Sequence, residues 1–79
     1  MWNRIHMVTQ SDYKESFIHR VRRAREESCY TQENLANLLN VDRGKYAKYE
    51  SRSYLPSHLI EEFCEITGAD IEWLITGKQ

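Results

Sequence analysis

The sequence lacks a long hydrophobic run, a repeat, a low-complexity tract and a Gly/Ser linker. Its apolar runs are only a few residues long, whereas a membrane-spanning helix needs about 20 residues. Residues 1–8 contain neither the apolar block nor the small-residue cleavage site of a secretory signal. We therefore expect a cytoplasmic protein that does not cross a membrane, folded as one domain of 79 residues.

The sequence also has few residues that bind metals or carry catalysis. Cys29 and Cys64 are far apart and have no CxxC partner or nearby histidine at metal-ligand spacing. Two free thiols are expected, and a single disulfide between them is the alternative. His6, His19 and His58 have no metal or catalytic spacing, and no nucleophile has an identifiable base. We expect no metal, no cofactor and no enzymatic activity.

The net charge is small, but the charged residues are unevenly distributed. The net charge of −1 is unusual for a protein that binds a polyanion. Residues 12–52, however, contain nine Lys or Arg against seven Asp or Glu, whereas residues 53–79 contain one Lys against five acids. A basic first half and an acidic second half suit a molecule with one face toward phosphate and another facing away.

Apolar residues at helical spacing predict a long first helix. Between Asp12 and Ser28 they recur at intervals of four, four and three residues, which places them on one helical face. These residues are Tyr13, Phe17, Val21 and Ala24. Residues 1–11 show no such period, so we expect an arm over 1–11 and a helical domain over 12–79. On the other sides of the helix, Arg20, Arg22 and Arg23 form either a phosphate-facing stripe or a solvated face.

Capping residues mark the next two helices. Thr31 is suited to cap the start of a second helix, and Asn40 tolerates the left-handed conformation that a helix end needs. Asp42 can then cap a third helix from Arg43 to about Glu50. Two short helices joined by a tight turn are therefore predicted.

The same signals predict two further helices. After a loop over 51–55, Pro56 fits the first position of a fourth helix, which Gly68 ends. Asp70 caps a fifth helix, closed by Gly77. The apolar residues that mark the second, fourth and fifth helices are Leu35, Leu38, Leu39, Leu59, Ile60, Phe63, Ile66, Ile71, Trp73, Leu74 and Ile75. The predicted fold class is all-α, a single compact domain of five helices without a strand.

The second and third helices have the spacing of a helix-turn-helix unit. Ala36 supplies the small residue that two steeply crossing helices need, and Asn40 supplies the turn. Side chains expected to hold the unit to the core are Leu35, Leu39, Val41, Tyr46 and Tyr49. Those left free of the core are Asp42, Arg43, Gly44, Lys45, Ala47 and Lys48. On a helix whose N-terminal end enters a major groove, these positions reach base edges and phosphates.

These residues resemble the lambda-repressor-like helix-turn-helix domains of phage repressors, Cro proteins and related bacterial regulators of XRE type. The resemblance covers about residues 17–78. It rests on the arginine-rich first helix ending at Arg25, residues 31–36 (TQENLA), residues 41–50 (VDRGKYAKYE), Pro56-Ser57, and residues 67–77 (TGADIEWLITG).

The resemblance implies a role for each matching position. Positions that read bases are Asp42, Arg43, Gly44 and Lys48, and positions that bind phosphates are Gln32, Lys45, Arg52 and Ser53. Arg43 is the best candidate for a bidentate contact with guanine. Arg25 and Glu50 match a pair that forms a partly buried salt bridge, which gives them a structural role.

Four positions depart from the family pattern. Cys29 and Arg52 stand where relatives commonly have glycine, so both are expected to strain a positive-φ turn. Gly44 weakens the third helix at a base-facing position. Tyr46 replaces a smaller aliphatic residue, so its pocket must be larger or its hydroxyl must reach solvent.

The implied function is a transcriptional repressor that binds double-stranded DNA as a homodimer, on a pseudo-palindromic operator. Trp73 is expected to belong to the core, although the family often dimerises through the C-terminal region. Two alternatives remain. One is the antitoxin of a toxin–antitoxin pair, which binds its own operator and a protein partner. The other is a protein-interaction adaptor that has lost DNA binding.

Overall fold

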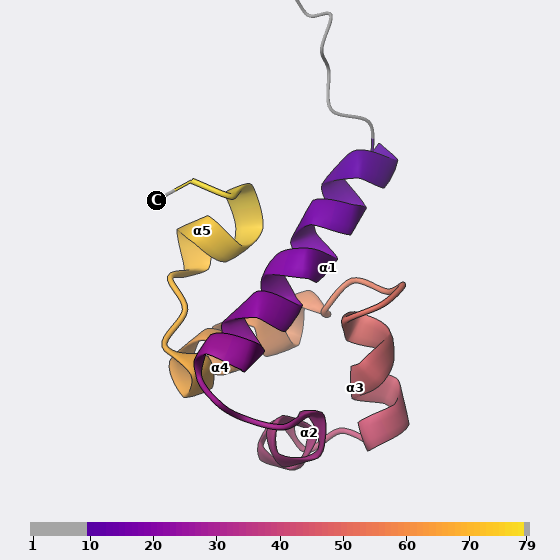
Figure 1. Ribbon diagram of the computed structural model, residues 1–79, viewed down its shortest axis with the longest axis vertical. Coiled ribbons are helices and arrows are strands. Elements are labelled where there is room, and N and C mark those ends of the chain that lie inside the picture. The colour runs from indigo at the N-terminus through magenta and orange to yellow at the C-terminus, as the bar shows by residue number, and fades with distance from the viewer. Residues whose placement is uncertain (1–9, 79) are drawn as a thin grey trace, which may run out of the picture.

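The computed structural model describes residues 10–78, over which the chain forms five α-helices and no strand (Figure 1). The helices are α1 (Gln10–Glu27), α2 (Gln32–Leu39), α3 (Arg43–Tyr49), α4 (Ser57–Thr67) and α5 (Ile71–Thr76). The predicted all-α class and the number of helices are confirmed. Because α1 already begins at Gln10, the last two residues of the predicted arm are helical. The rest of that arm, residues 1–9, lies outside the described residues.

Local capping sets most of the helix boundaries, as the sequence predicts. The Thr31 hydroxyl accepts from the Asn34 amide at 3.0 Å, and the Asp70 carboxylate accepts from the Trp73 amide at 2.9 Å. Asn40, Gly68 and Gly77 end their helices in the left-handed region, with φ of 62°, 80° and 82°. Each cap satisfies backbone groups that a helix end leaves without a partner.

The predicted start of the fourth helix is wrong by one residue. Pro56 has φ −60° but an extended ψ of 145°, so it precedes α4, which begins at Ser57. The fixed φ of proline suits both positions, and ψ decides between them. The proline side chain has no hydrogen-bonding group, and α4 accordingly has no side-chain cap.

The core lies where α1 crosses the other helices (Figure 1). The largest fully buried side chains are Val21, Leu35, Tyr46, Phe63 and Leu74. Burying each apolar side chain of this size stabilises a fold by roughly 1.5–3 kcal/mol. Because each of the five helices contributes one residue to this group, the same core fixes the position of α2 and α3.

Several apolar residues with helical spacing lie outside the core. Tyr13, Leu38, Ile71 and Ile75 are 36–49% exposed. Tyr13 sits near the start of α1, and its hydroxyl donates to the Ile75 carbonyl at 2.8 Å. Leu38 is on the outer side of a helix that buries Leu35, Ala36 and Leu39. Trp73 is half-buried and packs against the core, in agreement with the prediction.

The arginines of α1 make contacts within the molecule. Arg20 donates to the carbonyls of Leu74 and Ile75, at 2.8 and 3.2 Å, and so holds the end of α5 against α1. Arg22 and Arg23 form ion pairs one helical turn along, at 3.2 and 2.8 Å. Among the described residues, no helix has both the length and the apolar character needed to span a membrane.

Candidate nucleic-acid interface

A tight turn joins α2 to α3. Asn40 takes the left-handed conformation, and the next amide, that of Val41, donates back to the Ala36 carbonyl at 2.9 Å. Ala36 is fully buried between the helices. An alanine leaves room for the backbones to approach where a longer side chain would separate them. The chain therefore changes direction within three residues, 40–42, and presents the start of α3 outward.

The start of α3 is exposed and capped by its own carboxylate. Asp42 Oδ2 accepts from the amides of Gly44 and Lys45, at 2.9 and 3.3 Å. A Cβ at Gly44 would stand 3.1 Å from this oxygen. Glycine thus lets the cap come close to the helix. The predicted base-facing side chains Arg43 and Lys48 are both exposed.

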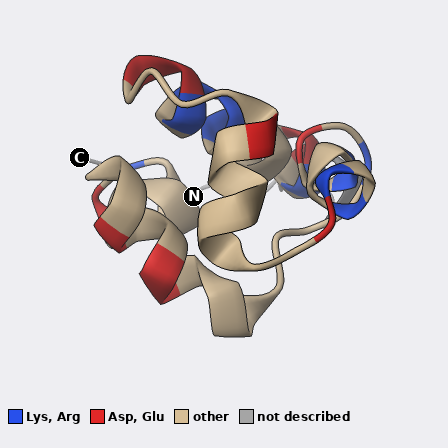
Figure 2. Cartoon of the chain, turned by 90° about the horizontal axis from the view of Figure 1, so that it is seen from below, with Lys and Arg blue, Asp and Glu red and all other residues tan. Residues whose placement is uncertain are grey.

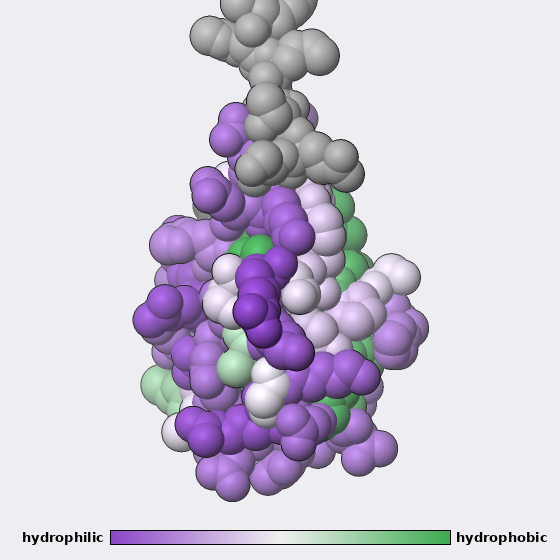
Figure 3. Space-filling view, turned by 90° about the vertical axis from the view of Figure 1, so that its right-hand side faces the viewer, coloured by the Kyte–Doolittle hydropathy of each residue, from purple (hydrophilic) through white to green (hydrophobic). Residues whose placement is uncertain are grey.

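The face that α3 and the following loop present is hydrophilic over most of its area (Figure 3). Its exposed basic residues are Arg43, Lys45, Lys48 and Arg52. Figure 2 shows basic residues on α3 and acidic residues on α4 and α5, on the other side of the molecule. The charge separation predicted between the two halves of the chain is therefore also a separation in space.

The loop after α3 uses its backbone amides internally. The amides of Arg52 and Ser53 both donate to the Lys48 carbonyl, at 2.9 and 2.8 Å. Any phosphate contact at these positions must therefore come from the side chains. The expected strain at Arg52 is wrong, because Cys29 and Asn40 are the non-glycine residues with positive φ among those described. At Cys29 the expectation is correct, since φ is 67°.

A buried polar cluster ties the unit to α1. The Glu50 side chain at the end of α3 is 2% exposed and meets Arg25 in a two-pronged ion pair, with N–O distances of 2.7 and 3.1 Å. Arg25 also donates to the Tyr30 carbonyl at 2.9 Å. One guanidinium thus fixes α3 and the segment before α2 relative to α1.

Two more donors complete the hydrogen bonding of Glu50, and the sequence predicted neither. The Tyr46 hydroxyl donates to Oε2 at 2.5 Å, and the Gln32 amide donates to Oε1 at 3.0 Å. The Tyr46 hydroxyl therefore has a buried partner and does not reach solvent. Gln32, expected to contact phosphate, has its amide group turned inward and its side chain half-buried.

Burial and hydrogen bonding shift the pKa values of this cluster. Burial raises the pKa of Glu50, but hydrogen bonds from Arg25, Tyr46 and Gln32 outweigh it, so the pKa lies below the ordinary value of 4.5. Burial, together with the bond to Glu50, raises the pKa of Tyr46 far above the ordinary value of 10.0. At neutral pH the cluster is therefore a carboxylate surrounded by donors.

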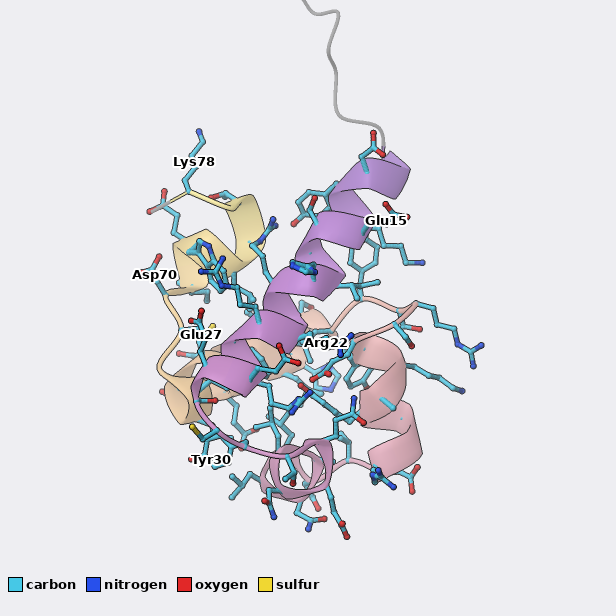
Figure 4. All side chains as sticks on the ribbon, in the orientation of Figure 1. Glu15, Arg22, Glu27, Tyr30, Asp70 and Lys78 are labelled. Atoms are coloured by element: carbon cyan, nitrogen blue, oxygen red, sulfur yellow. The ribbon has the colours of Figure 1, made fainter. Side chains whose placement is uncertain are left out.

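A cleft of about 610 Å³ lies away from α3, between the second half of α1 and α5. Trp73 lines it together with Arg23, whose guanidinium lies 5.9 Å from the ring centroid. Its acidic lining residues are Glu27, Asp70 and Glu72. In Figure 4, Glu27 and Asp70 lie on the α5 side of α1, whereas Arg22 lies toward α3.

Residues 10–78 contain no group of three His, Cys, Asp or Glu able to hold a metal ion. Cys29 is exposed, Cys64 is buried, and both are free thiols.

The steep pair α2 and α3, with a capped, exposed second helix, defines a helix-turn-helix protein. A family model described as a helix-turn-helix domain matches residues 18–79, and the chain belongs to this family, which is of the Cro/C1 (XRE) type. Domains of this family bind DNA and are typically not enzymes. Comparison with curated proteins gave no match, and comparison with solved structures gave none.

Proposed function

We propose that this protein is a sequence-specific transcriptional regulator that represses genes by binding double-stranded DNA with α3 in the major groove. The observation that carries this proposal is the exposed, basic start of α3, held rigidly to α1 through the buried Glu50 cluster. A reader of base edges must keep its side chains in a fixed register. A regulator of the bacterial or phage kind acts in the cytoplasm.

The proposed base contacts come from the start of α3. Arg43 is exposed and its long side chain suits a bidentate bond to guanine, which discriminates against other bases by about 1–3 kcal/mol. Asp42, Gly44 and Lys48 complete the base-facing set. The proposed phosphate contacts are Gln32, Lys45, Arg52 and Ser53. Because the side-chain NH2 group of Gln32 is bonded to Glu50, Gln32 would contact a phosphate through its backbone amide at the start of α2 or, by way of a water molecule, through its side-chain carbonyl.

We propose that the repressor acts as a homodimer. One domain of this size offers few base contacts, and pairing doubles them. A dimer would read a pseudo-palindrome whose half-sites are one helical turn, about 34 Å, apart. Ile71 and Ile75 are 45% and 38% exposed and lie one turn apart on α5, which supports pairing through the C-terminal region.

Selection from a random duplex pool tests this function. The wild type should enrich a palindromic motif, and Arg43→Ala should lose preference at one base pair of each half-site while the others remain. Arg22→Ala is the matched control, because its arginine is exposed but bonded to Glu26 on α1. Absence of enrichment by the wild type at low salt would refute the proposal.

The acidic cleft beside Trp73 favours a second candidate, in which a protein partner binds this side of the molecule. In the antitoxin form of this hypothesis, operator binding and partner binding coexist on opposite faces. In the adaptor form, DNA binding is lost. Titration of duplex DNA at two salt concentrations separates the two forms. The antitoxin form requires binding that weakens steeply with salt, because phosphate contacts release counterions, whereas the adaptor form requires no such binding.

A further inference from the structure

A cluster of aromatic rings at the start of α1 holds a lysine that the predicted interface does not include. The rings of Tyr13 and Phe17, on α1, lie 6.2 and 5.7 Å from the ring of Tyr54, in the loop after α3. The ammonium of Lys14 lies 5.4 Å from the centroid of the Tyr54 ring. A cation at this distance is attracted to the ring face.

This contact brings α1 to the loop that follows α3. Tyr54 comes directly after Ser53, a proposed phosphate contact, and two residues after Arg52, another. Lys14 is 40 positions earlier in the sequence, so only the fold places its charge beside this loop. The two helical aromatic residues pack against Tyr54 and keep its ring in place, so the site of the lysine is defined before any ligand arrives.

The ammonium of Lys14 keeps its hydrogen-bonding capacity. A ring face attracts the charge but accepts no ordinary hydrogen bond, and an ammonium has three N–H donors. Lys14 forms no ion pair with another described residue. Its exposed neighbour Glu15 points about 100° away around the helix. A phosphate oxygen is the partner that such a donor group, on this side of the molecule, is suited to bind.

We propose that Lys14 binds a backbone phosphate adjacent to the one contacted by Arg52 and Ser53, so that the DNA interface extends from the α3–α4 loop onto α1. Tyr54 acts as a positioning residue, because its ring holds the lysine over the loop. The inference rests on the proposed DNA-binding function. Since a phosphate contact is independent of base identity, Lys14 contributes affinity and salt dependence but no sequence preference.

The salt dependence of binding tests this contact. Dissociation constants for the selected duplex are measured by fluorescence anisotropy over a series of NaCl concentrations, with wild type, Lys14→Gln, Tyr54→Leu and Lys78→Gln. Lys78 is the matched control because it is an exposed lysine near the C-terminus, on the opposite side from α3 (Figure 4). Thermal unfolding of each variant establishes that it is folded.

Lys14→Gln should lower the slope of log K against log salt by roughly 0.9 per protomer, the amount for one phosphate. Its selected motif should be unchanged, Tyr54→Leu should lose part of the same slope, and Lys78→Gln should match the wild type. If the wild type binds and Lys14→Gln keeps the full slope, the inference is overturned and the proposed function stands. If Tyr54→Leu keeps the full slope while Lys14→Gln lowers it, the positioning role of the Tyr54 ring is overturned. A wild type that binds no duplex overturns both proposals.

Discussion

At the scale of single residues, Cys29 has the least favourable backbone conformation in the described part of the structure. It is an exposed residue with φ of 67° in the turn after α1. In this region the Cβ of an L-residue crowds the backbone, and glycine is free of that crowding. The thiol is free, so the cysteine side chain offers little in return.

Replacing Cys29 by glycine should therefore stabilise the protein, by about 0.5–1 kcal/mol once the greater flexibility of glycine in the unfolded chain is subtracted. Urea unfolding measures the change. Cys29→Ser is the control, since it removes the thiol but keeps the Cβ, and it should leave the midpoint unchanged. Equal stabilisation by serine and glycine would show that the backbone conformation is not the cause.

At the scale of helices, one carboxylate orients α2 and α3. Glu50 accepts hydrogen bonds from side chains of α1, α2 and α3, so a change in any of these helices alters its surroundings. A buried charge without partners is strongly destabilising, whereas this one is fully bonded. The arrangement gives stability a definite dependence on pH.

The pKa of Glu50 is lowered in the folded state from 4.5, so its contribution to stability is present above pH 4.5 and is lost as pH falls through the folded pKa. Gln32→Ala removes one of the hydrogen bonds that lower this pKa. It should cost about 1.5–3 kcal/mol at neutral pH, the range for a bond to a charged group. The loss should shrink as pH falls through the folded pKa of Glu50, because a protonated carboxyl no longer forms a bond to a charged group.

Urea midpoints between pH 7 and pH 3 measure this difference. Asn37→Ala is the matched control, because it changes an exposed amide on the same helix. A constant difference between Gln32→Ala and wild type at all pH values would mean that Gln32 acts without Glu50.

Helix caps are local signals, which a sequence carries, whereas contacts between helices are not. Thr31, Asp42 and Asp70 cap helices through amides two or three residues away, and the sequence was sufficient to predict all three. The hydrogen bond from Gln32 to Glu50 and the contact of the Lys14 ammonium with the Tyr54 ring join residues 18 and 40 positions apart. They depend on how helices cross, which no short pattern encodes.

At the scale of the whole molecule, the two ends of the described chain are held together by side chains. Arg20 and Tyr13, both on α1, bind carbonyls at the end of α5. The helix itself has six residues, too few to be stable alone. The helical structure of α5 therefore depends on the burial of Leu74 in the core and on the hydrogen bonds from Arg20 and Tyr13.

Arg20→Ala should accordingly loosen α5 without unfolding the rest. The variant removes two hydrogen bonds, and a net cost of about 1 kcal/mol for each allows local opening roughly 30 times more often. Amide hydrogen exchange measures this for Leu74 and Gly77, whose N–H groups are bonded within α5 and its cap. The amides of α4 serve as the internal reference. Equal acceleration in α4 and α5 would mean that the whole domain opens as one unit.

The separation of charge between α3 and the helices α4 and α5 gives this nearly neutral molecule an electric dipole. A polyanion exerts little net force on a charge of −1, but it exerts a torque that turns the basic end toward itself. At physiological ionic strength the torque acts only within about 8 Å, the screening length. Diffusing molecules would thus be reoriented during the last moments of an encounter, which raises the productive fraction of collisions rather than their number.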